Sequence, residues 1–537
     1  SNLMSEKKQN FLQGTAMLAM ATAIVKVIGA LYKIPLNAII GTQGFGYYST
    51  AYEIYAVLLM ISTAGLPVAM SRMISQASSL EQYKQVRKIY TVARTIFLSL
   101  GLGGTLLMVF GSKLLAGAMN HGDAWMAIAA LGPACFLICL MSTYRGFFQG
   151  QSNMMPTSVS QVLEAICKLA LGLGAAIVVL QLTNNYAMAA AAAILGVTAS
   201  CLVSSLYLNH CFRKGYKAMP LTGEEGESGK TIAKSLLAIA VPITIGAAGL
   251  QFLTVLETGT YMGRLLETMT QEQANVQKGI YNFTQKIYNM PCAFITPITI
   301  SAIPSITALL TKENHKGAKE TAESAARVTA LISAPCAVGL MVVAQPVVAV
   351  LGGYTGERLA LATNLMTILG ACIVFNAVVL MTNALLQAHG HVNLPVINMF
   401  VGGILKLAAV FILTGNPHIG ILGTPIGSLI CYVSITALNL ITIKRVIPHS
   451  PAIVKNLLRS VMAALIMGGA VWLTHFGLAS WLGQASGRSL VSVVLCGVPV
   501  VVGVVVYAVA AIALKAITRD DCMLLPKGEK IAKLLHL

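Results

Sequence analysis

The sequence predicts an all-α polytopic membrane protein of about 14 transmembrane helices, built as two six-helix lobes followed by two C-terminal helices. The composition is the first observation: of 537 residues, 56% are hydrophobic and only 10% are charged. A soluble domain carries roughly 25% charged residues. The second observation is that continuous apolar runs of about 20 residues recur to the end of the chain, as membrane-spanning helices require. The third is the placement of the basic residues.

The apolar runs define the expected elements in chain order. They are continuous rather than alternating, which excludes the strand pattern of a transmembrane barrel. We expect spans at residues 11–40, 45–68, 89–110, 124–145, 157–181, 186–208, 233–258, 279–303, 325–350, 359–384, 394–414, 419–442, 456–477 and 490–514.

Most of the 36 lysines and arginines fall in alternate loops between these spans. The loop after the second span, for example, carries Lys84, Arg87 and Lys88, whereas the loop after the third carries Lys113. Basic loops stay on the cytoplasmic side of a membrane. We therefore expect a multi-pass protein of the bacterial cytoplasmic membrane with both termini in the cytoplasm. This topology accounts for the net charge of +18 without nucleic acid as a partner.

A weak internal repeat divides the chain into lobes. Segment 46–55 matches segment 279–288, and segment 149–168 matches segment 387–406 at nearly the same spacing. The spacing covers six spans, an even number, so both copies share one orientation, as in transporters with parallel repeats. The expected domains are an N-terminal lobe (1–208), a cytoplasmic linker (209–232), a C-terminal lobe (233–445) and a segment with the last two spans and a cytoplasmic tail (446–537).

Charged residues inside the spans are the candidate functional residues. A charge at the centre of a bilayer costs roughly 2.5–3.5 kcal/mol on insertion scales, so it normally faces a cavity or a partner. The candidates are Lys26, Lys33, Glu53, Arg94, Glu164, Lys168, Glu257, Lys286 and Lys406.

Four of these residues predict a site for an anionic substrate. Lys26 and Lys33 lie nearly two helical turns apart and share one face of the first span. Lys33, Glu53 and Lys286 lie at similar depth below the outer surface. We expect Lys26, Lys33 and Lys286 to bind substrate in one chamber between the lobes, with Glu53 as an internal counter-charge. The alternative is that Lys33 reaches the outer interface and that Lys26 pairs structurally with Glu53.

The fifth span of each lobe carries a buried lysine. Glu164 and Lys168 are spaced as a helical pair, which favours a structural role for both. Lys406 is the repeat counterpart of Lys168 but lacks the acid one turn earlier, so we include it among the substrate-binding candidates. Arg145, at the cytoplasmic end of the fourth span, serves either as an anchor or for substrate access.

Glu257, at the end of the seventh span, is the candidate for a coupling ion. It either neutralises Arg264, two turns further on, or binds a coupling cation. The histidines fall mostly in loops and form no metal-binding pattern, and no phosphate-binding loop is present. We therefore expect no metal, no cofactor and no catalytic residue. A coupling monovalent cation or the membrane potential is left as the energy source.

Three segments carry a resemblance to a known family. They are residues 26–36, 41–48 and 65–72, with a fourth similarity at 149–161. The chain resembles the stage V sporulation protein B and polysaccharide-exporter branch of the MOP superfamily, which includes the MurJ-type lipid II flippases. The resemblance implies two bundles with alternating access. It also implies a substrate in which sugars are linked to undecaprenyl through pyrophosphate.

The resemblance also assigns site residues. Lys26 and Lys286 match cavity cations of the family's first and eighth helices. The second helix of this sequence lacks the basic residues that the family has there, and it carries the acidic residue Glu53 instead. The last two spans match the helices at which the lipid tail is thought to bind in lipid II flippases.

Together these observations predict a flippase for lipid II or a related glycan-lipid. Its partners would be that substrate, membrane lipids and cell-wall synthesis proteins. One alternative is a cation-coupled multidrug antiporter of the same superfamily, whose cavity should be acidic and aromatic. Another is a non-transporting membrane scaffold or lipid-modifying enzyme, which should show clustered histidine, aspartate or serine at one membrane face.

Overall fold

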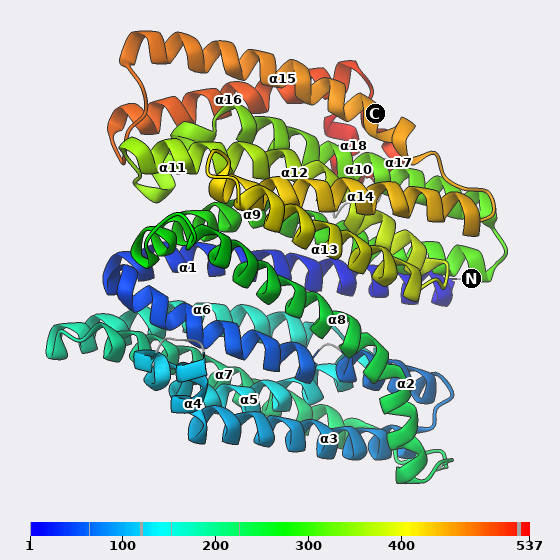
Figure 1. The fold of residues 1–537 in the computed structure, drawn as a ribbon. Coiled ribbons are helices and arrows are strands. Elements are labelled where there is room, and N and C mark those ends of the chain that lie inside the picture. The colour runs from blue at the N-terminus through cyan, green and yellow to red at the C-terminus, as the bar shows by residue number, and fades with distance from the viewer. Residues whose placement is uncertain are drawn as a thin grey trace. The chain divides into compact units, whose positions relative to one another are not determined.

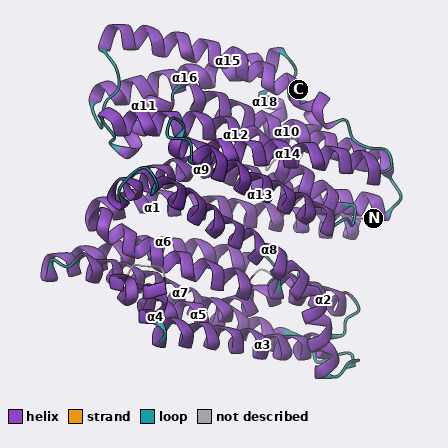
Figure 2. Cartoon of the chain, viewed as in Figure 1, coloured by secondary structure: helices purple, strands orange, loops and turns teal. Residues whose placement is uncertain are grey.

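The computed structural model describes residues 2–63, 65–118, 122–151, 153–224, 226–522 and 528–536. All regular secondary structure in these residues is helical (Figure 2). The chain forms two compact units, Ser1–Phe252 and Leu253–Leu537, which divide inside one long helix. The lobe and linker bounds expected from the sequence stay a prediction, although residues 209–218 belong to the helix that precedes the connecting loop.

In its described residues the first unit holds a short 3-10 helix at Gly122–Ala124 together with seven α-helices and the start of an eighth (Figure 1). The α-helices are α1 (Asn2–Thr63), α2 (Leu66–Ser79), α3 (Tyr83–Phe110), α4 (Ser112–Ala118), α5 (Trp125–Gly150), α6 (Met155–Thr183), α7 (Tyr186–Ala218) and α8 (Gly229–Leu265).

The second unit begins within α8 and holds the remaining helices. They are α9 (Gln271–Thr311), α10 (His315–Val342), α11 (Ala344–Gly352), α12 (Gly356–Ala388), α13 (Asn393–Thr414), α14 (Gly423–Val446), α15 (Ile453–Leu482), α16 (Leu490–Ala513), α17 (Arg519–Cys522) and α18 (Gly528–Leu534).

Within the described residues, thirteen helical segments are long and apolar enough to cross a membrane. They correspond to all the expected spans except 279–303. That span lies in α9, a helix of 41 residues, and some of its side chains fall outside the described part of the chain. The structure therefore confirms an all-α polytopic membrane protein.

Span one and most of span two lie in the single long helix α1, which is interrupted at Gly41, and the end of span two lies in α2. Pro35 lies in the same helix, and the helix continues through it. Gly41 has φ 70° and ψ 177°, a conformation that glycine adopts without the steric cost that a Cβ would add. The turn between the first two spans therefore depends on the glycine.

The ninth expected span, 325–350, is broken in the structure. Helix α10 ends at Val342 and the short helix α11 starts at Ala344. Pro346 lies in the first turn of α11, where its missing backbone N–H is tolerated, whereas it would remove a hydrogen bond from a continuous helix. The proline therefore explains why one apolar run forms two helices.

Close packing of α6 on α7 supports the core of the first unit. A Cβ added at Gly196 of α7 would lie 2.5 Å from Cα of Gly172 on α6, so the two backbones touch there. A Cβ at Gly172 would lie 2.6 Å from the hydroxyl of Tyr32 on α1. These small residues bring α1, α6 and α7 together, as glycines do at helix contacts in membranes.

We expect Gly196→Ala to destabilise the protein by ~1–3 kcal/mol, because the added methyl group overpacks the contact with Gly172. The measurement is the apparent melting temperature of the full chain in detergent. Gly174→Ala on α6 is the matched control, since a Cβ there meets nothing within 4 Å. Equal melting temperatures for both variants would contradict the assigned contact.

A buried carboxylate ties the C-terminal segment to the second unit. Asp521 of α17 is fully buried and accepts two hydrogen bonds of 2.8 Å from Arg327 of α10. Arg327 also donates to Asn456 of α15 at 2.8 Å. Bidentate pairing of this kind fixes geometry as well as charge. The contact joins α10, α15 and α17 at one end of the unit.

Candidate functional site

Two lysines of the first unit lie against a group of tyrosines. We call this group the Tyr52 cluster; it consists of Tyr32, Lys33, Tyr48 and Tyr52 of α1 and Lys168 of α6. Helical spacing places Tyr48 and Tyr52 on one face of α1, and the turn at Gly41 brings Tyr32 beside Tyr48. The contact of α1 with α6 adds Lys168. Tyr48 and Tyr52 stack with ring centroids 5.6 Å apart. The cluster is thus built from the second expected span and the two spans packed beside it.

Lys168 is the centre of the Tyr52 cluster. Its Nζ donates a hydrogen bond of 2.9 Å to the hydroxyl of Tyr52. The same Nζ lies 5.0 Å from the centroid of the Tyr52 ring and 5.8 Å from that of Tyr32. Lys33 Nζ lies 5.8 Å from the Tyr52 centroid. Both ammonium groups are therefore within cation–π range of one ring.

The groups in direct contact with these two ammonium groups are neutral, and the nearby carboxylate of Glu164, one turn before Lys168, is paired with Arg145. A phenol hydroxyl and aromatic faces attract a cation, but they leave its net charge in place. Two like charges at one ring in a poorly solvated part of a protein repel each other and favour an anion beside them. The Tyr52 cluster is therefore suited to bind a group with more than one negative charge.

Arg145 of α5 forms the second polar feature of the first unit. Its Nη2 lies 3.4 Å from Oε2 of Glu164 on α6, and its Nε donates to the hydroxyl of Ser160 at 3.2 Å. Glu164 also accepts a contact of 3.7 Å from the thiol of Cys201. The sequence favoured a pair between Glu164 and Lys168 within one helix. The structure instead pairs Glu164 with Arg145, and Lys168 turns to Tyr52.

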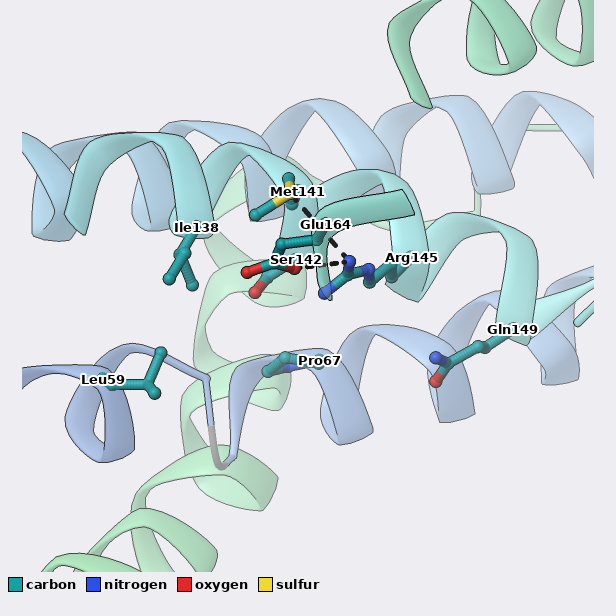
Figure 3. Close-up of a pocket in the computed structure, with 8 residues that line it drawn as sticks. All are labelled: Leu59, Pro67, Ile138, Met141, Ser142, Arg145, Gln149 and Glu164. Carbon is teal, nitrogen blue, oxygen red and sulfur yellow. Dashed lines mark hydrogen bonds and ion pairs between the residues drawn. The ribbon is translucent and has the colours of Figure 1, made fainter. Parts of the chain in front are cut away.

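A cavity of about 280 Å³ lies beside this ion pair (Figure 3). Arg145, Ser142 and Gln149 of α5 line it together with Glu164 of α6. Figure 3 shows Leu59 and Pro67 facing these side chains from α1 and α2. The cavity lies entirely within the first unit, with Leu59 and Pro67 on one side and a mixed wall of polar groups with Ile138 and Met141 on the other.

The second unit contains a buried ion pair. Lys406 Nζ on α13 lies 2.8 Å from Oε2 of Glu257 on α8, and their side chains are 20% and 7% exposed. Lys406 lacks an acid on its own helix, as expected, but receives one from another helix. The sequence left open whether Glu257 neutralises Arg264. Arg264 instead pairs with Glu267 at 3.1 Å, and Glu257 binds the ammonium group of Lys406.

The other candidates are placed as follows. Lys26 of α1 and Glu53 of the same helix have exposed side chains, whereas Lys286 of α9 is half-buried. Tyr48 and its repeat counterpart Tyr281 are both buried, as are Tyr55 and Tyr288. The repeated tyrosines thus occupy core positions in both units, while Glu53 and Lys286 beside them do not. The joint role expected for Lys26, Glu53 and Lys286 stays a prediction.

Lys168 is the residue whose role the sequence reasoning underestimated. Glu164 one turn earlier offered a local explanation for its charge. The internal repeat could have indicated this role, because it aligns Lys168 with Lys406 and so places a lysine at the same position of an apolar span in both lobes. In the structure both lysines are half-buried and contact an earlier helix of their own unit.

Comparisons with known proteins agree with this architecture. The family profile described as "Polysaccharide biosynthesis protein" matches residues 11–310, and a second profile, "MatE", matches residues 279–412. The chain is 25% identical to "Lipid II flippase MurJ" of Bacillus subtilis over 517 residues, covering 92% of this chain and 94% of the relative. It is 26% identical to "Stage V sporulation protein B" of the same organism over 452 residues, covering 82% and 85%.

A solved structure shares the fold. The structure titled "Lipid II flippase MurJ, inward closed conformation" matches with a TM-score of 0.66 and 14% identity, covering 92% of this chain and 97% of that one. At that identity the match concerns the fold alone, and it confirms the two-lobed arrangement. The resemblance read from the first two spans is also confirmed.

Proposed function

The chain belongs to the polysaccharide biosynthesis protein family, and from this premise we propose that it is a flippase. It moves a glycan linked through pyrophosphate to a polyprenyl lipid, such as lipid II or a related precursor, from the inner to the outer leaflet by alternating access. The relatives support transport rather than lipid-modifying catalysis, since one of them is itself named a flippase.

The Tyr52 cluster is the observation that carries the proposal. A pyrophosphate cannot cross hydrocarbon unaided, because it would lose its hydration. Lys33 and Lys168 provide two positive charges inside a membrane-embedded unit, and both contact the uncharged side chain of Tyr52. Such charges replace hydration electrostatically where the dielectric constant is low. The polyprenyl tail remains in the lipid while the head group passes through the protein.

The remaining site residues complete the proposal. Lys26 and Lys286 are proposed as further ligands of the pyrophosphate, and Glu53 as the counter-charge that competes for lysines when substrate is absent. Glu257 and Lys406 are proposed as the coupling element, since an ion pair that opens and closes can respond to a monovalent cation or to the membrane potential. Both termini are proposed to lie in the cytoplasm of a bacterial cell.

A reconstitution experiment tests the proposed function. The full chain is placed in liposomes that contain lipid II or another polyprenyl-pyrophosphate glycan, and exposure of the head group at the opposite leaflet is followed over time. We expect exposure faster than in protein-free liposomes for at least one glycan. Rates equal to protein-free liposomes for every glycan would exclude a flippase.

A second candidate is a cation-coupled multidrug antiporter, which the match of the "MatE" profile to residues 279–412 favours. The basic character of the Tyr52 cluster argues against it, because a site for cationic drugs should be acidic. The same liposomes discriminate the two functions when loaded with a cationic dye. Dye movement driven by a proton or sodium gradient, without glycan movement, would establish the antiporter.

A further inference from the structure

The cavity beside Arg145 has the lining of a site for a small amphipathic molecule. Its volume of about 280 Å³ is small for a drug-sized ligand but ample for one sugar ring. Leu59 and Pro67 form an apolar wall, and Ile138 and Met141 of α5 add apolar surface beside the polar groups that face it. A carboxylate, a guanidinium group, an amide and a hydroxyl lie on the other side, from Glu164, Arg145, Gln149 and Ser142. A pyranose ring has the same division, with C–H faces and a hydroxyl rim.

The polar groups of this wall keep unused hydrogen-bonding capacity. The ion pair between Arg145 and Glu164 is 3.4 Å long, whereas charge-assisted bonds are normally about 2.7–2.9 Å. Gln149 donates to Thr157 at 3.4 Å, which is also long. A carboxylate offers about four acceptor sites and a guanidinium group five donors. These side chains are therefore able to shift their bonds to the hydroxyls of a sugar.

We propose that this cavity binds the sugar ring that is bonded directly to the pyrophosphate of the substrate. The inference rests on the proposed function and deepens it by naming the part of the glycan that the protein recognises. Glu164 and Lys168 are one turn apart on α6, a rise of about 6 Å. A sugar against Glu164 therefore has its linked phosphate within reach of Lys168.

This arrangement divides recognition between two neighbouring places in the first unit. The Tyr52 cluster holds the charge, and the cavity reads the hydroxyls of the first sugar. Hydrogen-bonding groups that match a substrate hydroxyl discriminate against analogues that lack it, because the protein groups are then left unpaired. The cavity would thus select among glycans that share the same pyrophosphate.

The test measures binding of two soluble probes to the full chain in nanodiscs. N-acetylglucosamine 1-phosphate carries both a sugar and a phosphate, whereas inorganic pyrophosphate carries only the charge. Gln149→Ala removes one polar contact, and Leu59→Trp fills the cavity without touching a polar group. We expect either variant to lower the affinity for N-acetylglucosamine 1-phosphate roughly tenfold and to leave the affinity for pyrophosphate unchanged. Gln151→Ala is the matched control, because Gln151 does not line the cavity and bonds to Met219.

The outcomes separate this inference from the proposed function. Unchanged affinity for the sugar phosphate in both cavity variants, or no affinity in the wild-type chain, would overturn the sugar site even if the liposomes show glycan movement. If the variants lose affinity for the sugar phosphate alone and no glycan moves in the liposomes for any lipid, the sugar site is supported and the proposed flippase function is excluded. An equal loss of affinity for both probes would also contradict the sugar site, because the cavity residues would then affect binding of the phosphate charge rather than of the sugar.

Discussion

Replacing Lys168 with methionine is expected to slow glycan-lipid movement by about 100-fold or more while the chain stays folded. One charge about 4 Å from a phosphate contributes about 4 kcal/mol at an effective dielectric constant of about 20. That energy corresponds to roughly a thousandfold in affinity. Lys33 remains at the Tyr52 ring and retains part of the attraction. Folding is preserved because the substitution removes a charge whose burial is itself costly.

The measurement is the initial rate of head-group exposure in liposomes, with affinity for inorganic pyrophosphate as a second readout. Lys113→Met is the matched control, since Lys113 also lies over an aromatic ring, 4.9 Å from the centroid of Trp125, but is exposed and outside the Tyr52 cluster. If Lys168→Met exposes the head group at the wild-type rate, the Tyr52 cluster has no role in transport. Lys168→Arg keeps the charge and should recover part of the rate.

The helical architecture was predictable because apolar length is a local property of the sequence. Each run of about 20 apolar residues must form its own backbone hydrogen bonds in a membrane, whatever it packs against. The interruptions were less predictable. Pro35 and Gly41 both stand near the end of the first span, and only the folded chain shows that the break occurs at the glycine. A proline near a helix end is tolerated when neighbouring groups satisfy the freed carbonyl.

The site was predictable to the extent that charges in apolar runs are conspicuous. Lys33 and Lys406 were both recognised because a charge in a membrane requires a partner or a cavity. Their partners were not recognised, because Tyr52 lies beyond the break at Gly41 and Glu257 lies on another helix. Glu164 has Lys168 one turn away on its own helix, yet it pairs with Arg145 of α5. Spacing along one helix shows which ion pairs can form within it, but it does not show whether a neighbouring helix supplies a closer partner.

Glu257 shows the same limit over a greater sequence distance. The only cation that sequence spacing offered was Arg264, two turns along the same helix. The contact with Lys406 depends on the packing of α13 against α8, which no local pattern encodes. The repeat still pointed to Lys406, because it is the counterpart of Lys168. Internal duplication was therefore the one long-range signal in the sequence.

Neutralising one member of the Glu257–Lys406 pair is expected to destabilise the second unit by ~3–5 kcal/mol, because the other charge is left buried without a partner. The single variants are Glu257→Gln and Lys406→Met. The double variant should recover stability to within about 1 kcal/mol of the wild type, since replacing a whole buried pair is often neutral. Apparent melting temperatures of the full chain in detergent measure all three. Glu267→Gln is the control, because its pair with Arg264 is 3.1 Å long but has side chains 25% and 55% exposed. Exposed pairs contribute only ~0–1 kcal/mol.

The double variant also tests the proposed coupling role, because it separates stability from transport. A pair that serves only to hold α8 against α13 would leave glycan movement and its response to ion gradients unchanged once stability is restored. A coupling pair would instead leave a folded protein whose transport no longer responds to a sodium, proton or voltage gradient. We expect the second result, since Glu257 is buried with its charge balanced by a single ammonium group on another helix. Any cation or potential that competes with this ammonium group changes whether the two helices are held together.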